Sequence, residues 1–447
     1  MRLDRLALGL TRLTARWTPS AFAIACLLTL VTLVAGVTLG EASLPEVIRS
    51  WGDGFWALLR FGMQMCLIVF CGYMVAVAAP VRAALRWLAR RPRSPRQAVV
   101  AMALVAMAIA WLHWGLGLIA SAVMVGFVAA EQPRADYRLL VAVSYFGLGA
   151  TWHAGPSGSV PLLLATPNNF LVKGGVFDQL IGIDRTIGMP FNIGFVTVVV
   201  TALALLAALL HPRDEDVVSI DRAVADELAA YEPPDRPASP TPAQRVDHSP
   251  LINLALGAAG IAWLVLRFTR EGFTLDLDRV NFIFLIAAVL LHWRPASLTR
   301  AAREGSAHLH GIVLQFPLYA GMFGIIKGTK LASKLTAAFV SLSSRRTFPL
   351  VTFWYSGLLN YFVPSGGSKW AIEAPYLLRA GAKLGVPVEK TAMAYAYGDM
   401  STNLIQPFWA IPLLSVAKLE FKDILGYEVL AFLLYSIISS VALAFFY

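Results

Sequence analysis

Apolar residues fill most of this chain in long runs that short polar segments separate. Runs of about 20 apolar residues have the length that an α-helix needs to cross the hydrocarbon core of a bilayer. The main runs are Ala21–Leu39, Gly54–Ala79, Pro190–Leu210, Leu251–Phe268, Asn281–Trp293, His308–Ile326 and Ile424–Phe446. The pattern therefore predicts an all-α, polytopic membrane protein.

Another apolar run, Leu139–Ala165, contains a stretch that interrupts a helix. Within Thr151–Pro161, the residues Gly155, Pro156, Gly158 and Pro161 break the ladder of backbone hydrogen bonds. Lipid cannot replace these bonds, so such a break is tolerated only where protein or a wet cavity surrounds it. Broken membrane helices point to the substrate sites of secondary transporters, although a simple proline kink is the alternative for a single break.

The broken stretch occurs twice. A shift of 251 positions places Phe146–Leu163 on Tyr397–Leu414, and six of these eighteen positions are identical, where chance gives about one. The same shift superimposes two further pairs, namely Gln64 on Gln315 and the glycine-rich stretch His113–Gly117 on Pro364–Ser368. One offset fits separate segments, which indicates two homologous halves.

Each half is predicted to contain a hairpin and a broken segment. The hairpins cover Ala98–Ala130 and Pro349–Leu378, and each is either re-entrant or a pair of full crossings, because hydropathy does not decide between them. The second broken segment is Thr391–Val416. The predicted units are a first half over residues 1–210, a cytoplasmic linker over 211–250 and a second half over 251–447. The linker is rich in proline and charge, and Ser219–Tyr231 within it has the pattern of a short amphipathic helix.

The number of crossings predicts that the two halves are inverted in the membrane. Two apolar runs precede the hairpin of the first half, and three precede the hairpin of the second half. The additional crossing reverses the direction of every later element in the second half relative to its counterpart in the first. Inverted repeats give many secondary transporters two alternating gates around one central site. The N-terminus and the linker are then cytoplasmic and Tyr447 lies outside. Against this, inversion also places a loop with Lys330, Lys334, Arg345 and Arg346 outside, contrary to the positive-inside rule.

Composition excludes an ordinary soluble protein of two or three domains. Of the 447 residues, 57% are hydrophobic and only 14% are charged, and the mean hydropathy is +0.65. The net charge of +10 does not indicate nucleic-acid binding, because its arginines lie in short loops beside apolar runs, most densely over 82–96. The arginines before Ala21–Leu39 precede a run too long for a signal peptide. We expect a multi-pass protein of a bacterial cytoplasmic membrane.

Polar residues at the four breaks are the candidates for substrate binding. A helix that restarts after a break offers free N–H groups and a partial positive charge, which suits a small carboxylate. Serines at these restarts are equally explained by helix capping, and amides in membrane helices also join helices together. The predicted substrate site comprises His113, Trp114, Thr151, Ser157, Gly158, Ser159, Asn360, Ser365, Gly366, Gly367, Ser368, Thr402, Asn403 and Gln406.

Ionisable side chains at membrane depth are functional candidates because their burial is expensive. Asp399, before the second break, is the predicted site of coupling to H⁺ or Na⁺. Lys369 and Glu373 are four residues apart, so a mutual ion pair is the simplest explanation for them. His153 either titrates or is hydrogen-bonded to a nearby carbonyl. The three cysteines have no metal or disulfide spacing, and we expect no metal and no cofactor beyond the coupling ion.

Several motifs resemble those of the short-chain fatty acid transporter family, and the likeness covers essentially the whole chain. They are Trp51-Gly-Asp-Gly-Phe-Trp56, Phe61-Gly-Met-Gln-Met65, Gly158-Ser-Val-Pro-Leu162, Asp216-Val-Val-Ser-Ile-Asp221, Val363-Pro-Ser-Gly-Gly367 and Gln406-Pro-Phe-Trp-Ala-Ile-Pro412. The resemblance implies uptake of short-chain monocarboxylates such as butyrate and acetoacetate. It also implies re-entrant hairpins, because the family looks like part of the ion transporter group.

The chain departs from the family pattern at four positions. The pattern has glycine at 153, glycine then histidine at 368 and 369, and glutamate at 399, where this chain has His153, Ser368, Lys369 and Asp399. The differences at His153 and Lys369 imply an altered chain-length preference or coupling. The partners considered are a monocarboxylate substrate, the lipid bilayer and a second copy of the chain; nucleic acid is not expected.

Two alternatives remain beside cation-coupled uptake. The same fold serves an exporter or an ion antiporter, because direction follows gradients. A less favoured alternative is an intramembrane serine protease, because Gly155-Pro-Ser-Gly158 matches a rhomboid-type motif and His308 and His310 lie in a later membrane segment. The repeat explains Ser157 without catalysis, because its equivalent is Phe408. We therefore expect a transporter and not an enzyme.

Overall fold

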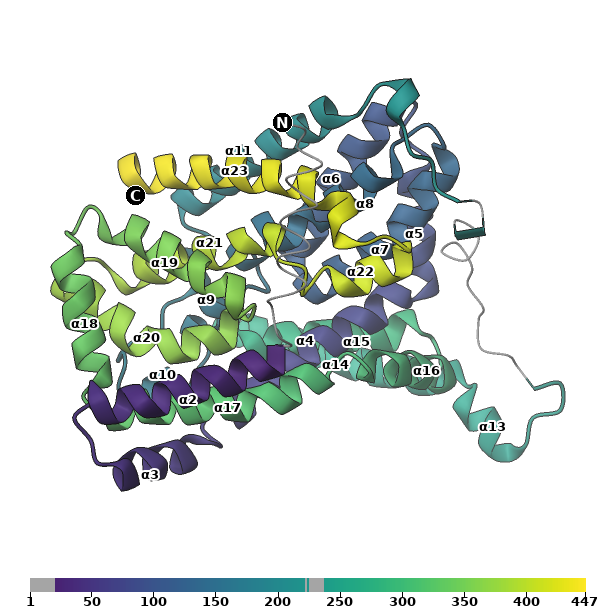
Figure 1. Ribbon diagram of the computed structural model, residues 1–447. Coiled ribbons are helices and arrows are strands. Elements are labelled where there is room, and N and C mark those ends of the chain that lie inside the picture. Colours follow the sequence, from purple (N-terminus) through teal and green to yellow (C-terminus); the bar gives the residue numbers. More distant parts are fainter. Residues whose placement is uncertain (1–20, 222, 225–236) are drawn as a thin grey trace.

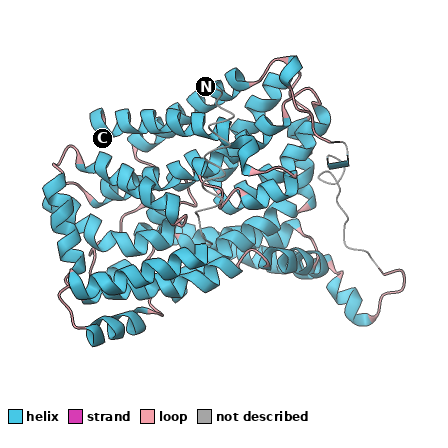
Figure 2. Ribbon diagram, viewed as in Figure 1, coloured by secondary structure: helices cyan, strands magenta, loops and turns pink. Residues whose placement is uncertain are grey.

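The computed structural model describes residues 21–221, 223–224 and 237–447, and within these residues it contains helices and no strands (Figure 2). The prediction of an all-α protein is confirmed. Most of the amphipathic segment expected at Ser219–Tyr231 lies outside the described residues. Seven of the described helices are long and apolar enough to cross a membrane by length and composition. Only 17% of the apolar stretch of α14 (Pro250–Glu271) is buried, as expected for a helix that faces lipid.

The elements of the first half follow the predicted order. They are α2 (Ala21–Thr38), α3 (Leu44–Gly54), α4 (Leu59–Val77), α5 (Ala79–Ala89), α6 (Pro95–Leu112), α7 (Trp114–Glu131), α8 (Tyr137–Ala150), η1 (Trp152–Ala154), α9 (Ser159–Ala165), α10 (Phe170–Lys173), η2 (Ile183–Arg185) and α11 (Pro190–Leu210). The linker region contains η3 (Asp214–Asp216) and α13 (Pro242–Asp247).

The second half begins with α14 and then repeats this order. It continues with α15 (Leu277–Leu291), α16 (Pro295–Ser306), α17 (His310–Gly328), α18 (Leu331–Leu342), α19 (Phe348–Phe362), α20 (Gly366–Lys383), α21 (Val388–Ser401), η4 (Thr402–Ile405), α22 (Ile411–Ala417) and α23 (Phe421–Phe445). The shift of 251 carries α4 onto α17 residue for residue and α8 onto α21 likewise. The same shift places α2 and α3 within a few residues of α15 and α16. It also places α5, α6 and α7 within a few residues of α18, α19 and α20. The internal repeat therefore extends well beyond the two breaks.

Four short helices lie where the sequence suggested only connecting segments. Helix α3 occupies most of the connection expected at Gly40–Asp53, and α5 lies in the arginine-rich segment, whereas α16 and α18 are their counterparts in the second half. Helix α3 begins with a capping box, because the Glu46 carboxylate accepts from the Ser43 backbone N–H at 2.8 Å. Helices α3, α5 and α16 are amphipathic and α18 is mainly apolar, and all four are too short to cross a bilayer.

The breaks are shorter than the glycine pattern indicates. The first hairpin is interrupted at His113 alone, because α7 begins at Trp114, and the second is interrupted over 363–365. The second broken segment stays helical to Ser401 instead of breaking at Gly398. Several glycines serve close packing instead: a Cβ on Gly117 would lie 2.6 Å from the Ala110 Cα.

The two ends of the first hairpin lie together. Arg90, shortly before the start of α6, forms an ion pair of 2.9 Å with Glu131 at the end of α7. Its tip meets the first break, because the Trp114 N–H donates to the Ser157 hydroxyl at 2.8 Å and the Trp111 indole donates to the Ala154 carbonyl at 3.2 Å. A hairpin whose tip ends beside a broken helix is the geometry expected for the re-entrant alternative.

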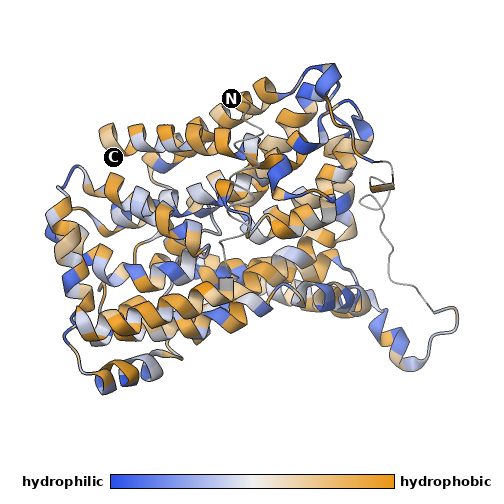
Figure 3. Cartoon of the chain, viewed as in Figure 1, coloured by the Kyte–Doolittle hydropathy of each residue, from blue (hydrophilic) through white to orange (hydrophobic). Residues whose placement is uncertain are grey.

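The halves pack on each other reciprocally. Helices α2 and α3 of the first half lie on α17 of the second, and α15 and α16 of the second half lie on α4 of the first. In Figure 1, α8 and α22 lie to the right and α21 and α9 to the left, so the two broken segments run in opposite directions. Hydrophobic residues dominate helices α2, α11 and α23 (Figure 3).

Reciprocal packing depends on glycines at which two helices touch. A Cβ on Gly54 of α3 would lie 2.7 Å from the Gly324 Cα of α17, and a Cβ on Gly324 would overlap the Ser50 carbonyl oxygen. We predict that Gly324→Ala destabilises the protein by about 1–3 kcal/mol, because backbone cannot move aside for the new methyl group. Thermal unfolding in detergent measures this. Gly426→Ala in α23 is the matched control, because open space surrounds it; equal melting temperatures for both variants would contradict the close contact.

Candidate functional site

The two hairpin tips and the two breaks enclose a central cavity. Its lining comes from α4, α7, α8, η1, α9, α17, the second hairpin and the second broken segment. The residues are Met65, Trp114, Leu148, Trp152, Ser159, Ile312, Phe316, Asn360, Pro364, Ser365, Gly366, Gly367, Asp399, Asn403 and Trp409. Such convergence of discontinuous helices is the feature that marks transporter substrate sites.

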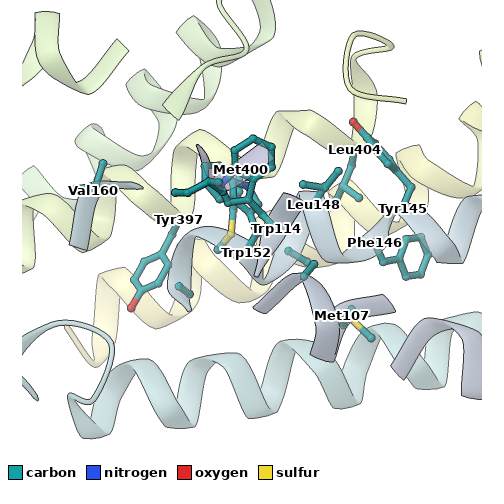
Figure 4. Packing of buried hydrophobic residues seen from close by; sticks show 14 of the residues in the cluster. Met107, Trp114, Tyr145, Phe146, Leu148, Trp152, Val160, Tyr397, Met400 and Leu404 are labelled. Carbon is teal, nitrogen blue, oxygen red and sulfur yellow. The ribbon is translucent and has the colours of Figure 1, made fainter. Parts of the chain in front are cut away.

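Three tryptophans form much of the wall. The ring centroid of Trp114 lies 5.8 Å from that of Trp152 and 5.6 Å from that of Trp409, and Figure 4 shows Trp114 and Trp152 together within the buried cluster. The Trp409 indole donates to the Pro364 carbonyl at 2.9 Å. The indole N–H groups of Trp114 and Trp152 have no hydrogen-bond partner among the described residues, so the cavity wall holds two buried donors that a ligand oxygen can satisfy.

The start of α20 forms the polar end of the cavity. Ser365 is the N-cap residue, but its side chain makes no capping hydrogen bond to the helix backbone, and its hydroxyl accepts from the Ser368 hydroxyl. A Cβ on Gly366 would lie 2.6 Å from the Asp399 Oδ2 and 2.7 Å from the His153 Cε1. Glycine is therefore required at position 366, because a side chain would keep the start of α20 away from Asp399. The first N–H groups of α20 have no partner within the helix.

Asp399 is the centre of a buried network of charged and polar groups. Its Oδ2 lies 2.9 Å from the His153 Nδ1, and its Oδ1 lies 3.1 Å from the Lys369 Nζ. Lys369 also donates to the Ser356 carbonyl at 2.9 Å and to the Ser356 hydroxyl at 3.0 Å. Asp399 and His153 are fully buried and Lys369 is 2% exposed, so these contacts replace the hydration that burial removes.

The second nitrogen of His153 determines the charge of its ring. The Val160 backbone N–H donates to the His153 Nε2 at 3.2 Å, so Nε2 carries a lone pair and the proton resides on Nδ1. His153 is then neutral and donates to Asp399. The Lys369 ammonium is left as the positive charge that balances the Asp399 carboxylate.

Glu373 lies at the edge of this network and contacts it through a longer ion pair. Its Oε2 is 3.8 Å from the Lys369 Nζ, and neither carboxyl oxygen has a hydrogen-bond partner among the described residues. The expected ion pair between Lys369 and Glu373 is present at 3.8 Å, but Lys369 also pairs with Asp399 and lies closer to it, at 3.1 Å. The expectation of a carbonyl partner for His153 is wrong, because its Nδ1 faces a carboxylate.

A second and larger cavity of about 250 Å³ adjoins the first. The two share Trp114, Ile312, Phe316, Pro364, Ser365 and Trp409. The larger cavity is also lined by Tyr73 near the end of α4 and by His308 and His310 at the start of α17. It thus extends from the tip of the second hairpin toward the side of the arginine-rich segment that follows α4.

The structure places about half of the predicted substrate-site residues around the central cavity. These are Trp114, Ser159, Asn360, Ser365, Gly366, Gly367 and Asn403, together with the predicted coupling residue Asp399. The others do not line it, namely His113, Thr151, Ser157, Gly158, Ser368, Thr402 and Gln406.

Most residues outside the cavity support the breaks. Thr151 donates to the Met107 carbonyl at 2.8 Å and Thr402 to the Gly357 carbonyl at 2.9 Å. The His113 Nδ1 accepts from the Leu116 N–H at 3.1 Å. Gln406 accepts from the Phe408 N–H at 2.7 Å and donates to Asn403 at 3.3 Å. The contacts of His113 and Gln406 satisfy backbone N–H groups beside the breaks, whereas those of Thr151 and Thr402 join the broken segments to α6 and α19.

The protease alternative finds no support in this geometry. The Ser157 hydroxyl accepts from the Trp114 N–H, and Ser157 lines neither cavity described above. His308 and His310 lie in the larger cavity. The structure therefore does not bring together the serine and the histidines that such chemistry needs.

Sequence reasoning missed Trp152 and the apolar residues that complete the cavity, Met65, Leu148, Ile312 and Phe316. Trp152 had a usable signal, because it lies next to His153 inside the first break. The other four have none, because apolar residues that line a cavity look like any other apolar residue of a membrane helix.

An all-helical membrane protein with paired hairpins and broken segments around a central cavity has the fold of a transporter. The fold is similar to that of the YdaH transporter of Alcanivorax borkumensis (TM-score 0.60, 16% identity, 96% of this chain and 99% of that one). It is also similar to that of MtrF of Neisseria gonorrhoeae (TM-score 0.58, 16% identity, 99% of this chain and 96% of that one).

The chain belongs to the short-chain fatty acid transporter family, whose model matches residues 2–446. It is 37% identical to an Escherichia coli (strain K12) protein named "Putative short-chain fatty acid transporter", over 99% of this chain and all of that protein. It is 33% identical to a Haemophilus influenzae protein of the same name, over 95% of this chain and 96% of that one. The resemblance inferred from the motifs is confirmed.

The contacts of Lys369 predict a strong coupling with Asp399. We expect Lys369→Met to destabilise the protein by about 3–5 kcal/mol, because it leaves the Asp399 carboxylate buried without its cation. The double variant Lys369→Met/Asp399→Asn recovers part of this loss, because no uncompensated charge remains. Thermal unfolding of both single variants and the double variant measures the coupling; strictly additive effects would show that the two groups do not interact.

Proposed function

We propose that the protein carries short-chain monocarboxylates such as butyrate or acetoacetate across the bacterial cytoplasmic membrane by cation-coupled uptake. The observation that carries this proposal is a mainly apolar central cavity with two unpartnered indole donors and a helix start at one end. Membership of the family and the names of its relatives support the substrate class.

The carboxylate supplies most of the recognition in this proposal. A short alkyl tail contributes only about 0.8 kcal/mol per buried CH₂, so polar contacts must hold the substrate in place. The first N–H groups of α20, the Ser365 hydroxyl and the indoles of Trp114 and Trp152 are the available donors around the cavity. Backbone N–H groups at a helix start favour an anion without a fixed cation.

Alternating access is supported by the reciprocal packing of the two halves and by the opposite directions of α8 and α21. We infer that the halves are inverted repeats, with the arginine-rich segment and the linker in the cytoplasm. The larger cavity then opens toward the cytoplasm.

Inversion places the loop with Lys330 and Lys334 outside, contrary to the positive-inside rule. This argument against inversion is weaker in the structure, because both lysines pair with Glu41 at 2.7 Å. The hydrogen bond from Lys330 and that from Lys334 lower the pKa of Glu41 to about 2, so this carboxylate stays charged at physiological pH.

Export is the second candidate. MtrF is one of a class of antimetabolite efflux pumps, and the similarity to it concerns the fold alone. The direction of transport depends on the coupling ion and its gradient, and the buried network around Asp399 is the proposed place of coupling.

Counterflow of labelled butyrate into proteoliposomes tests the substrate class. We predict that Trp152→Phe and Ser365→Ala each raise the apparent KM for butyrate by roughly tenfold to a hundredfold, because each removes one donor worth about 1–3 kcal/mol. Trp56→Phe is the matched control, because Trp56 is exposed. Absence of butyrate counterflow in the parent would refute the substrate, whereas unchanged KM values would place the carboxylate elsewhere.

Cysteine labelling tests the inverted arrangement. With the three native cysteines replaced by alanine, Arg93→Cys at the base of the first hairpin and Lys383→Cys at the base of the second are exposed positions. We predict that a membrane-impermeant thiol reagent labels Lys383→Cys in intact cells and Arg93→Cys only in inverted vesicles. Labelling of both from one side would refute the inverted arrangement.

A further inference from the structure

We propose that Glu373 is the group that carries a coupling proton, so that the coupling cation is H⁺ and not Na⁺. This inference rests on the proposed uptake of carboxylates and assigns its coupling site. It starts from an imbalance: two buried carboxyl groups, those of Asp399 and Glu373, share the single ammonium of Lys369.

The contacts of Lys369 assign its charge to Asp399. An ammonium has three N–H donors; two are directed at the carbonyl and hydroxyl of Ser356, and the group lies 3.1 Å from the Asp399 Oδ1. His153 supplies a further donor to Asp399. Asp399 is therefore the better compensated carboxylate, with an ammonium at 3.1 Å and a histidine N–H, whereas Glu373 has only the same ammonium at 3.8 Å.

Glu373 must then be neutral in this conformation. It is 1% exposed, and both of its carboxyl oxygens lack a hydrogen-bond donor among the described residues. A carboxylate without donors or water costs several kcal/mol to bury, and such a group takes up a proton instead.

The other groups that face Glu373 do not change this balance. They are Lys369 and Tyr376 on α20, Asp399 and Tyr395 on α21, and Tyr355 on α19, with the neutral His153 behind Asp399. The Tyr355 and Tyr376 hydroxyls bond to each other at 2.7 Å, and the Tyr395 hydroxyl donates to the Gly366 carbonyl at 3.1 Å. Helices α9, α10, α17 and α18 also pack on α20, and the lysines of the last three, Lys173, Lys327 and Lys334, are exposed.

The network explains why a proton and an anion travel together. Asp399 lines the same cavity as Ser365 and Gly366, so a bound carboxylate adds a second negative charge beside Lys369. With Glu373 protonated, the group of Lys369, Asp399, Glu373 and substrate carries a net charge of −1; with Glu373 ionised it carries −2, which low-dielectric surroundings disfavour strongly. Proton binding and substrate binding therefore strengthen each other by the same factor.

The proton step balances simply. One H⁺ from the outer solution binds a Glu373 carboxylate oxygen, and the same proton leaves to the cytoplasm once the substrate has gone. The Lys369 ammonium, 3.8 Å away, then compensates the ionised Glu373. Lys369 already occupies the cation position beside Asp399, which leaves no place for Na⁺ there.

Infrared spectroscopy tests the protonation of Glu373 without any substrate. Glu428 on α23 is the matched residue, because it too is fully buried and both of its oxygens lack a partner among the described residues. At neutral pH we expect Glu428→Gln to retain the C=O band of a protonated carboxyl group and Glu428→Gln/Glu373→Gln to lose it. A band that survives in the double variant, or is already absent in Glu428→Gln, would overturn the proposal.

Transport in proteoliposomes tests the coupling, with protein-free liposomes as the correction for leakage of butyric acid. We expect a pH gradient without Na⁺ to drive butyrate accumulation in the parent and in Glu428→Gln. Glu373→Gln, a neutral mimic of the protonated acid, should keep counterflow and lose accumulation. Accumulation by Glu373→Gln equal to the parent, or accumulation that follows only Na⁺, would overturn the inference. If the parent shows no counterflow, the substrate proposal fails while the infrared result still decides the state of Glu373.

Discussion

The backbone at the helix breaks must find its hydrogen bonds within the protein, because lipid offers none. The structure meets this demand with side chains from other segments. The Asn192 amide and the Trp111 indole both donate to the Ala154 carbonyl, the Asn403 amide donates to the Leu148 carbonyl, and Trp409 donates to Pro364. Each break is thereby joined to a neighbouring hairpin or helix, and the hairpin tips are held in the middle of the molecule.

Polar residues have two uses in this protein, and the need to pair backbone groups at the helix breaks explains only one of them. Residues such as Thr151 and Ser157 form hydrogen bonds with backbone partners, and they position the breaks. A smaller group keeps unpaired donors or charge beside the cavity, above all Trp152 and the network around Asp399. The proposed binding places of substrate and proton therefore coincide with the polar groups that the packing leaves incompletely satisfied.

The two halves are in close contact, and both contribute residues to the site. Helix α20 of the second half supplies Lys369 and Gly366, the first half supplies His153, and these groups meet at Asp399. Movement of one half against the other would change these contacts directly. The buried network is thus well placed to link the protonation of a side chain to the side on which the cavity opens.

The membrane class, the breaks and the repeat could all be predicted from the amino-acid sequence. Runs of apolar residues, paired glycine and proline positions and one constant offset are local or periodic signals, so they survive without coordinates. The sequence also singled out Ser365, Gly366 and Asp399, because glycine and charge inside apolar runs are costly unless they are used. The short helix α3 was missed because its connection is polar on average, although the capping box at Ser43 and Glu46 marks its start.

Which of these residues share a site depends on the packing of helices that are distant in the sequence. The spacing of Lys369 and Glu373 on one helix suggests an ion pair, yet the lysine lies closer to Asp399 on the next helix, because α20 and α21 pack together. Thr151 and Thr402 were indistinguishable from ligand-binding residues in the sequence. A hydroxyl that bonds a backbone carbonyl and one that faces a cavity differ only in what the fold places opposite them.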